Sequence, residues 1–474
     1  MSIDNFLLMR NEISLLAVIL LLLVGEIFIN NKKTLINAGI ILFVIHTIIG
    51  FLPIETGELF GGSFRTNKLV YFFKNVLNVG VIIVLLQSAD WIKQKLTKHN
   101  KSTEFYLLLF STLLGMYYMV SAGDFLMLFI GIELATIPTA ALVAYESGKV
   151  KSAEAGIKFI LSAALATGIS LFGISMLYAT TGSIYFSEVA NTLTNSSLSV
   201  LGFVFFFAGI AFKVSLVPFH FWTADTYEGA PISIASYLSV ISKASAVFVM
   251  LMVLFTVFQS LVDVWQPIIY GIAIATMFIG NLFALRQQNM KRFLAYSSIA
   301  QAGFILLGMI SNTALGITTV IYFAAIYIFS NLAAFGVVQS ISLKTGKENR
   351  KDYEGLYRTN PMLSLVMLMA LFSLAGIPPV AGFFGKFFLF SAAASKGYYL
   401  LVFLAVVNVT ISLYYYLLVV RNMFLRKSDD AIPFYKNSIL MKFGLVLSII
   451  GIFVIGLYSP FYEYIVSISN FVFK

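Results

Sequence analysis

Long apolar stretches, separated by short polar segments, run along almost the whole chain. Most are close to or longer than the roughly 20 residues that an α-helix needs to cross a bilayer. The segments between them are too short for a soluble domain. The pattern therefore predicts an all-α polytopic membrane protein with about fourteen transmembrane helices. These helices are expected near residues 13–29, 35–52, 69–89, 104–122, 125–144, 154–180, 200–217, 232–258, 265–285, 293–311, 314–342, 362–391, 397–425 and 439–469.

The composition agrees with a membrane protein and limits its chemistry. Of the 474 residues, 59% are hydrophobic and 11% are charged, whereas about a quarter of a soluble domain is charged. The chain has no cysteine, which excludes disulfides and cysteine-ligated iron–sulfur clusters. It also lacks a Walker loop, a dinucleotide-binding glycine motif and a His/Glu metal cluster. We therefore expect no cofactor or metal in this chain, and any redox chemistry to belong to partner chains.

Basic residues are divided unevenly between the loops. Lys and Arg number 31 against 21 Asp and Glu, which gives a net charge of +10. When the loops are assigned alternately to two sides, one side receives most of the basic residues, and the other receives Arg10, Arg65, Lys68, Lys396 and Lys474. By the positive-inside rule the richer side is cytoplasmic, so both termini are expected to face outward. The positive charge thus indicates topology, and no nucleic-acid partner is expected.

Five charged residues stand inside apolar sequence: Glu133, Lys158, Lys213, Lys243 and Lys386. A charge near the bilayer centre costs at least about 2.5–3.5 kcal/mol on insertion scales, so each needs a reason. One alternative is structural, because a lysine can extend to the interface or form an ion pair that locks helices together. The other is a proton or ion pathway, because burial disfavours the charged form of a lysine and a nearby carboxylate restores it.

Helix-breaking prolines lie beside two of these lysines. Pro218 follows Lys213 by five residues, and the pair Pro378-Pro379 precedes Lys386 in a long apolar stretch. Proline removes a backbone donor and clashes with the preceding turn, and freed carbonyls at membrane depth are tolerated only within protein or beside a wet cavity. Both helices are therefore expected to unwind, as interrupted helices do at the ion path of transporters. The alternative is an ordinary proline kink in a packing helix.

The three histidines are expected to differ in role. His220 stands two residues past Pro218 and between Lys213 and Lys243 in sequence. Because imidazole titrates near neutral pH, His220 is a candidate proton relay, with a structural hydrogen bond as the alternative. His46, alone in an apolar helix, is expected to be a packing residue, and His99, in a lysine-rich loop, to be solvated.

Other charged residues are expected near helix ends. Lys74 and Lys442 lie close to predicted helix starts. Asp225 and Glu228 belong to a turn, where they could cap the next helix; whether they also guide protons stays open.

Six motifs together give the chain a family resemblance. They are Gly131-Ile-Glu-Leu, Glu154-Ala-Gly-Ile-Lys-Phe, Phe212-Lys-Val-Ser-Leu-Val-Pro-Phe-His, Asp225-Thr-Tyr-Glu-Gly-Ala-Pro, Asn289-Met-Lys-Arg-Phe-Leu-Ala-Tyr-Ser-Ser-Ile and Ala375-Gly-Ile-Pro-Pro-Val-Ala-Gly-Phe. Each is weak alone, but their order and spacing are specific. Between about residues 105 and 425 the chain resembles the antiporter-like membrane subunits of respiratory complex I, and the Tyr227-Glu-Gly-Ala-Pro run resembles the subunit N branch of that family.

The resemblance implies an architecture of two inverted five-helix repeats, each containing one broken helix. Residues 1–103 would hold helices 1–3, residues 104–260 the first repeat with helices 4–8, residues 261–426 the second repeat with helices 9–13, and residues 427–474 helix 14.

The resemblance also implies a polar axis for proton translocation. In that axis Glu133 would be the acidic partner of Lys213, Lys243 the central lysine and Lys386 the exit-side lysine. Lys158 would be the basic residue of helix six, and His220 would link the first half-channel to the centre.

Two positions depart from the family pattern. Ala224 stands where many relatives have proline, and Gln301 where many have histidine. A relay through position 301 is therefore in doubt, because an amide can orient water but cannot carry a proton charge.

The resemblance implies a proton-translocating subunit of an NADH-quinone oxidoreductase in a bacterial inner membrane. FMN, iron–sulfur clusters and quinone would then be held by partner subunits, and this chain would contribute no redox step of its own. One alternative is a subunit of a multi-chain sodium/proton antiporter or of a membrane hydrogenase. Another is a passive membrane scaffold whose lysines are structural ion pairs.

Overall fold

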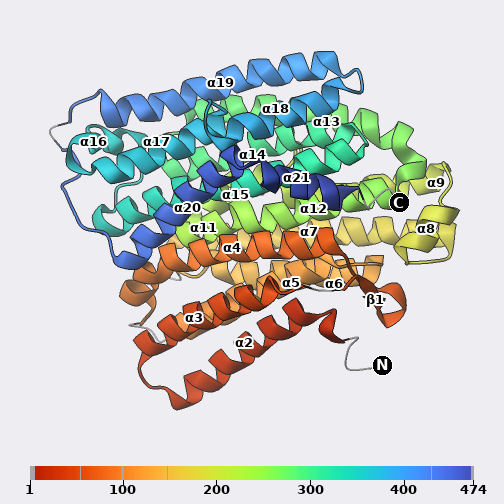
Figure 1. Ribbon diagram of the computed structural model, residues 1–474, viewed down its shortest axis with the longest axis horizontal. Coiled ribbons are helices and arrows are strands. Elements are labelled where there is room, and N and C mark those ends of the chain that lie inside the picture. The colour runs from red at the N-terminus through yellow and green to blue at the C-terminus, as the bar shows by residue number, and fades with distance from the viewer. Residues whose placement is uncertain (1–5, 54, 98–100, 147, 429, 471–474) are drawn as a thin grey trace.

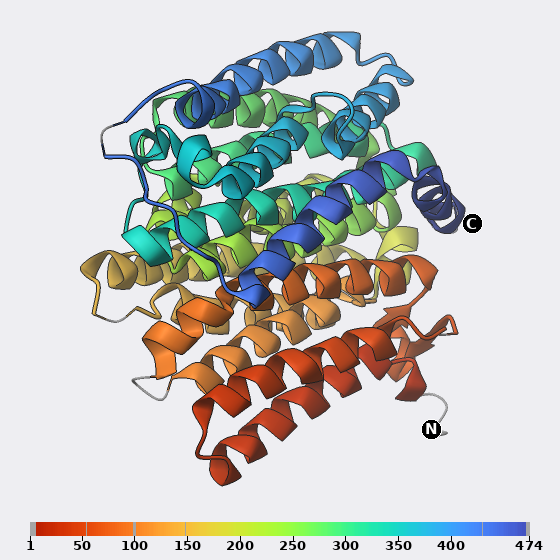
Figure 2. The same cartoon turned by 60° about the vertical axis from the view of Figure 1, so that its left-hand side comes forward.

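The computed structural model describes residues 6–53, 55–97, 101–146, 148–428 and 430–470. Lys98, His99 and Lys474, which entered the sequence predictions, lie outside these residues. The described chain forms a bundle of long helices that run roughly side by side, with the N-terminal helices along one edge and α19 along the opposite edge (Figures 1 and 2).

The elements fall into four groups along the chain. The N-terminal group is α2 (Arg10–Phe28), α3 (Lys32–Gly50), the antiparallel strands β1 (Gly57–Leu59) and β2 (Phe64–Thr66), and α4 (Lys68–Trp91). Next come α5 (Ser102–Val120), α6 (Phe125–Val143), α7 (Val150–Thr181), α8 (Phe186–Thr192), α9 (Ser197–Val214), α10 (Phe221–Gly229), α11 (Ile232–Tyr237) and α12 (Lys243–Thr256). The third group is α13 (Val262–Arg286), α14 (Met290–Ile310), α15 (Ala314–Thr345), α16 (Leu356–Thr359), α17 (Pro361–Ala375), α18 (Ala381–Ala394) and α19 (Tyr399–Phe424). The last is α20 (Ile439–Leu457) and α21 (Ser459–Ser469).

The predicted all-α membrane architecture is confirmed. Among the described residues, 13 helices are long and apolar enough to cross a membrane. The predicted stretch 362–391 is not one of them, because it is divided into the two shorter apolar helices α17 and α18. The last stretch, 439–469, is likewise divided, with α21 starting at a Ser-Pro pair. The chain is therefore a multi-pass membrane protein.

Both predicted helix breaks are present. The helix α9 ends at Val214, after which Ser215 takes a left-handed conformation with φ 67°. The helix α17 ends at Ala375, followed by Gly376 at φ 86°. In each case the prolines occupy the unwound segment before the next helix begins. The repeat symmetry and the domain boundaries stay predictions.

The central helices are almost completely enclosed by the others. In the most apolar window of α14 and of α15, 94% of the residues are buried, and in the span from Ile232 to Thr256 the share is 89%. The corresponding share in α2 is 28%, so α2 presents most of its side chains outside the bundle. A charged group within these windows, such as Lys243, is therefore enclosed by the protein.

A π-helical turn, Leu238–Ser242, joins α11 to α12 and places Lys243 directly after it. The sequence pattern did not predict this turn, because one residue of extra winding leaves the apolar run unchanged. Single π-turns inside α-helices occur often at functional sites.

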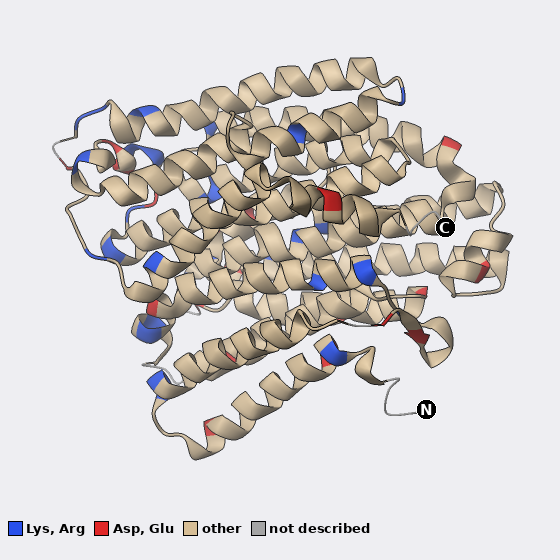
Figure 3. Cartoon of the chain, in the orientation of Figure 1, with Lys and Arg blue, Asp and Glu red and all other residues tan. Residues whose placement is uncertain are grey.

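Lysine and arginine residues gather at one end of the bundle, on the left in Figure 3, and a few lie isolated within it. We call the crowded end the basic end. It contains the loops after α13, α15 and α19.

Helices α5 and α6 approach closely at a glycine. A Cβ atom at Gly115 would lie 2.4 Å from the backbone nitrogen of Ala135 and 2.9 Å from the carbonyl oxygen of Gly131. We expect Gly115→Ala to separate the two helices and to lower the free energy of unfolding by about 1–3 kcal/mol, as overpacking does. The measurement is the thermal unfolding midpoint of the detergent-purified chain.

The matched control is Gly168→Ala. A Cβ atom at this glycine of α7 meets nothing within 4 Å. An unchanged midpoint in both variants would contradict the close approach of α5 and α6.

Candidate functional site

Lys213 lies in the last turn of α9 and reaches across to α6. Its Nζ donates to the Thr136 hydroxyl at 2.6 Å and to the Ile132 carbonyl at 3.4 Å. Glu133 is half-buried on the same helix, three residues before Thr136, but it is not within ion-pair distance of Lys213. In this structure the ammonium is thus held by neutral groups.

The first break leaves Lys213 free for this contact. The carbonyl of Phe212, at the end of α9, accepts a hydrogen bond of 2.9 Å from the indole of Trp222 in α10. The Val217 amide donates to the Thr276 hydroxyl at 3.1 Å. These two backbone groups of the break are therefore satisfied without the lysine.

A small cavity connects Lys213 with the next helix. It has a volume of about 10 Å³ and is lined by Thr136, Lys213, Trp222 and Ser242, among others. This volume holds about one water molecule. Because Ser242 directly precedes Lys243, a water in this cavity would lie between the two lysine-bearing segments.

Lys243 is buried in the centre of the bundle, with 2% of its surface exposed. Its Nζ donates to the Ser298 hydroxyl at 2.9 Å and to the carbonyl of the same residue at 3.3 Å. Ser298 belongs to α14, within the Ala-Tyr-Ser-Ser motif.

From α14 a chain of hydrogen bonds continues to Lys386. The hydroxyls of Ser297 and Tyr416 lie 2.5 Å apart. The Gln301 amide donates to the Tyr416 hydroxyl at 3.3 Å and to the Leu374 carbonyl at 2.9 Å. Lys386 donates to that same carbonyl at 2.7 Å. Gln301, which departs from the family pattern, therefore occupies the gap between the central and the last lysine.

Lys386 is bound to the end of the helix that the prolines interrupt. Besides Leu374 it binds the Ala375 carbonyl at 3.0 Å, and its Nζ lies 4.7 Å from the ring centroid of Phe304. Only 4% of the residue is exposed. The carbonyls freed by the second break are therefore satisfied by the lysine itself.

His220 is buried at the start of α10, with 6% of its surface exposed. Its Nδ1 has no hydrogen-bond partner among the described residues. No hydrogen bond joins it to Lys213 or Lys243 in the part of the chain that the structure describes. The structure thus leaves one ring nitrogen available but does not bring the histidine into direct contact with either lysine.

Lys158 lies apart from the other three lysines, in a surface cluster of charges. Its side chain is 46% exposed and forms ion pairs with Glu154 at 2.7 Å and with Asp225 at 2.9 Å. Arg292 binds Asp225 at 2.6 Å and Glu228 at 3.0 Å. These groups line a cavity of about 230 Å³.

The expected capping by Asp225 and Glu228 is wrong. The next helix, α11, has Pro231 at its N-cap and no side-chain cap. The two carboxylates instead form ion pairs with basic side chains of α7 and α14.

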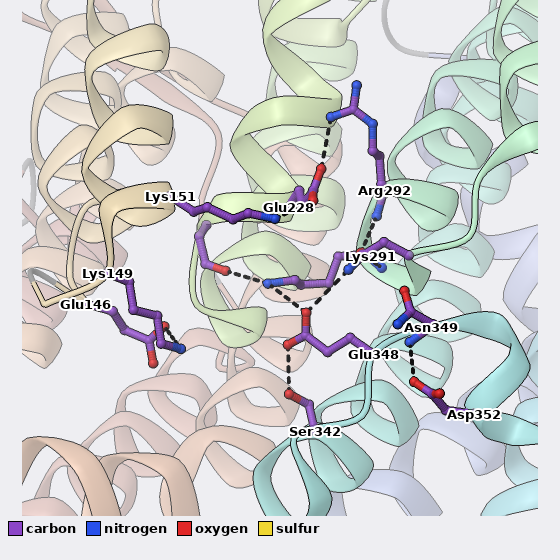
Figure 4. Close-up of polar contacts among 12 residues, drawn as sticks. Glu146, Lys149, Lys151, Glu228, Lys291, Arg292, Ser342, Glu348, Asn349 and Asp352 are labelled. Atoms are coloured by element: carbon purple, nitrogen blue, oxygen red, sulfur yellow. Dashed lines mark hydrogen bonds and ion pairs between the residues drawn. The ribbon is translucent and has the colours of Figure 1, made fainter.

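A second polar cavity, of about 320 Å³, opens at the basic end beside α11. Within it Lys291 lies 3.4 Å from Glu348 and 3.5 Å from the Ala230 carbonyl, and Ser342 donates to Glu348 at 2.8 Å. Figure 4 shows Lys291 of α14, Ser342 of α15 and Glu348 of the loop after α15 converging. The cavity also includes Ser233 of α11, the helix that leads to Lys243.

The sequence did not indicate the hydroxyl and amide groups that join the lysines. These are Thr136 and Ser298, which bind lysines, and Ser297 and Tyr416, which bind each other near Gln301. One signal was available for Thr136, which follows Glu133 by three residues and therefore shares its helix face. The others give no signal, because hydroxyl groups hardly change the hydropathy of a helix.

Comparison with known proteins identifies the class. A family model described as NADH:quinone oxidoreductase/Mrp antiporter, TM matches residues 122–412. A chain of the Mrp complex from Dietzia sp. shares the fold, with a TM-score of 0.85 at 18% identity over 100% of this chain and 98% of that one. The chain is therefore an antiporter-like membrane protein of this class.

Curated relatives narrow the assignment. NADH-quinone oxidoreductase subunit N of Phocaeicola vulgatus is 49% identical over 98% of both chains. A chain of respiratory complex I from Thermus thermophilus matches with a TM-score of 0.79 at 26% identity, over 96% of this chain and 97% of that one. The chain belongs to the NADH-quinone oxidoreductase subunit N family.

The contact of Lys213 with Thr136 can be tested by an isosteric change. Thr136→Val removes the hydroxyl and leaves a buried ammonium with one long bond to a carbonyl. We expect the free energy of unfolding to fall by about 1–3 kcal/mol, the cost of an unsatisfied buried polar group. The measurement is the thermal unfolding midpoint in detergent.

The control is Thr139→Val, one turn further along α6. Its hydroxyl bonds only the Ala135 carbonyl of its own helix, at 2.7 Å. Equal effects of the two substitutions would contradict a specific contact between Thr136 and Lys213.

Proposed function

We propose that this chain is the proton-translocating subunit N of a bacterial NADH-quinone oxidoreductase. The observation that carries the proposal is the row of Lys213, Lys243 and Lys386 inside the bundle, each held by hydroxyl or carbonyl groups of a neighbouring helix, with the Gln301 amide bound to the same carbonyl as Lys386. The 49% identity to a curated subunit N over nearly the whole chain supports the same conclusion.

The lysines would move protons through changes in the groups that face them. Lys213 is held by neutral partners while Glu133 lies on the same helix. A small displacement of the ammonium from Thr136 toward Glu133 would stabilise its charge, and the return would favour release of the proton. The one-water cavity beside Ser242 would carry that proton toward Lys243.

Between Lys243 and Lys386 the path would use hydroxyl groups and water. Serine and tyrosine hydroxyls both donate and accept, so they can pass a proton along a chain of hydrogen bonds. Gln301 would act by orienting water, because its Oε1 has no partner among the described groups and can accept a hydrogen bond. His220 would exchange a proton through its free Nδ1 by way of water.

Lys158 would act from the surface cluster. Its ion pair with Asp225 joins α7 to α10, the second half of the broken helix. In this position it would set the charge at the mouth of the path and hold α10 in place. The polar cavity beside α11 would supply protons from the basic end.

The redox cofactors and the quinone site of the complex would belong to other subunits. FMN, iron–sulfur clusters and quinone would be held there, and electron transfer would drive the charge changes in this chain. The basic end would face the cytoplasm of a bacterial inner membrane, both termini would lie outside, and protons would move outward. The neighbours would be lipid and the other membrane subunits.

We further propose two inverted repeats at residues 104–260 and 261–426, preceded by helices in residues 1–103 and followed by residues 427–474. The presence of one broken helix in each proposed repeat supports this division.

The role of Lys213 and Lys243 in proton transfer can be tested by substitution. Lys213→Ala or Lys243→Met should reduce proton-coupled NADH:quinone turnover of the assembled complex by about 10²-fold or more, because a positioned proton-transfer group is lost. Turnover and the pH change in inside-out vesicles measure this. Lys442→Met, at an exposed lysine of α20, is the control. Wild-type turnover with full pumping in the Lys213 variant would contradict the function.

The partner subunits distinguish a complex I subunit from a subunit of an antiporter or a hydrogenase. Mass spectrometry of proteins that co-purify with the tagged chain in mild detergent should find flavin and iron–sulfur dehydrogenase subunits. A set of purely hydrophobic antiporter subunits, with sodium-dependent proton exchange in the absence of NADH, would keep the fold and overturn the function.

A further inference from the structure

A second buried cluster of titratable groups lies in the N-terminal helices, away from the lysine row. It takes Glu12 from α2, His46 from α3, Lys74 from α4 and Tyr117 from α5. All four precede residue 122, where the match to the family model begins. The proposed function uses none of them.

The centre of the cluster is an ion pair closed off from solvent. Lys74 Nζ lies 2.5 Å from Glu12 Oε1, and each side chain is 2% exposed. The ammonium also lies 5.1 Å from the ring centroid of Phe64 and 5.6 Å from that of Tyr117. Lys74 lies close to the start of its helix, as predicted, because α4 begins at Lys68, and its side chain is buried inside the bundle.

Three buried amides meet beside this pair. A Cβ atom at Gly50 would lie 2.5 Å from Asn75 Oδ1, 3.5 Å from Asn11 Oδ1 and 3.6 Å from Asn78 Nδ2. These three atoms have no hydrogen-bond partner among the described residues, and neither has Glu12 Oε2. Buried polar atoms of this kind are normally satisfied by ordered water. The cluster therefore has the donors and acceptors for a few water molecules.

Hydrogen bonds extend the cluster to a histidine. The Tyr117 hydroxyl donates to Asn78 Oδ1, and His46 Nε2 lies 3.0 Å from that hydroxyl. His46 Nδ1 lies 2.8 Å from the Ser14 hydroxyl. His46 is 1% exposed and packs against Phe43 and Tyr117, as expected of a packing residue, and both of its ring nitrogens are also hydrogen-bonded.

The cluster lies away from the basic end and shares a helix with the centre of the bundle. Glu12 is the third residue of α2, and the loop at the other end of α2 leads to Lys32. On α5, the Thr112 hydroxyl lies 2.7 Å from that of Tyr237, which directly precedes the π-turn before Lys243. The helix α5 thus contacts both the cluster and the segment that positions the central lysine.

A purely structural role, in which the ion pair holds the helices together, does not explain why these polar groups are buried together. A buried ion pair is often no more stabilising than apolar residues of the same volume. A lock would also need neither a histidine nor a carboxylate oxygen without a partner.

We propose that Glu12 and Lys74, with His46 and the surrounding amides, form a second proton-holding site on the side opposite the basic end. A proton delivered through water at the amides forms an O–H bond on the Glu12 carboxylate while Lys74 keeps its charge. Loss of that proton restores the ion pair. This inference rests on the proposed function, since it requires protons to cross this chain.

The main test removes both charges together in the assembled complex. Glu12→Leu/Lys74→Met leaves no unpaired buried charge, so the complex should assemble. We expect proton-coupled NADH:quinone turnover to fall at least about tenfold, as when a positioned proton-transfer group is lost. The control is Glu26→Leu/Lys32→Met, which removes a partly exposed ion pair between α2 and α3. Wild-type turnover and pumping in the first variant would overturn the proposal.

Two further measurements keep the proposal testable if the double variant does not assemble. His46→Gln keeps hydrogen-bonding groups but cannot titrate, and it should slow coupled turnover. Infrared difference spectra of the working complex should contain a carboxylic acid C=O band that disappears in Glu12→Gln. The proposal is overturned if His46→Gln is fully active or if no such band exists.

Lys243→Met in the same preparations separates the two hypotheses. If Lys243→Met abolishes pumping while the Glu12/Lys74 variants pump normally, only the proposal of a second proton-holding site is wrong. If none of these variants affects pumping, the proposed function fails as well.

Discussion

The whole structure depends on the rule that a polar group inside a bilayer must find its partner within the protein. The two broken helices obey it in different ways. At the first break, the indole of Trp222 binds the freed Phe212 carbonyl. At the second, Lys386 binds the carbonyls of Leu374 and Ala375. Because tryptophan satisfies the first break, Lys213 is free to reach a neighbouring helix, whereas Lys386 is fixed to the helix end. The two helix breaks have similar backbone conformations, but Lys213 is free to move and Lys386 is not.

Much of the fold was predictable because the bilayer imposes strong signals. Apolar stretches, prolines in them and lysines next to the prolines all carry a large energetic cost, so the sequence shows them clearly. The positions of the lysines were harder to predict. Lys158 has apolar neighbours in sequence, yet α7 has 32 residues and extends about 48 Å at 1.5 Å per residue, well beyond a hydrocarbon core of about 30 Å. Its first turns therefore extend past the core, and Lys158 pairs with surface carboxylates.

The connections between the lysines could not be predicted for a different reason. Ser298, Tyr416 and Thr136 reach their partners across helix interfaces, and the pairing depends on how the helices pack. A hydroxyl can also bond the carbonyl of its own helix, so its presence in a helix does not reveal a partner elsewhere. Lys74 shows the same limitation for a charge: its place near the start of α4 was predicted, but its burial against Glu12 of α2 depends on how the helices pack.

The lysines fall into two groups according to what holds them. Lys213, Lys243 and Lys386 bind only hydroxyls and carbonyls among the described residues, whereas Lys74 and Lys158 bind carboxylates. A carboxylate stabilises the charged lysine, while neutral partners in a buried site do so weakly. The first three therefore lack a partner that holds them in the charged form, whereas the other two have one while their carboxylates are ionised. In the proposed second site the exchangeable proton is that of the Glu12 carboxylate, and the ammonium of Lys74 faces the rings of Phe64 and Tyr117 when Glu12 is neutral.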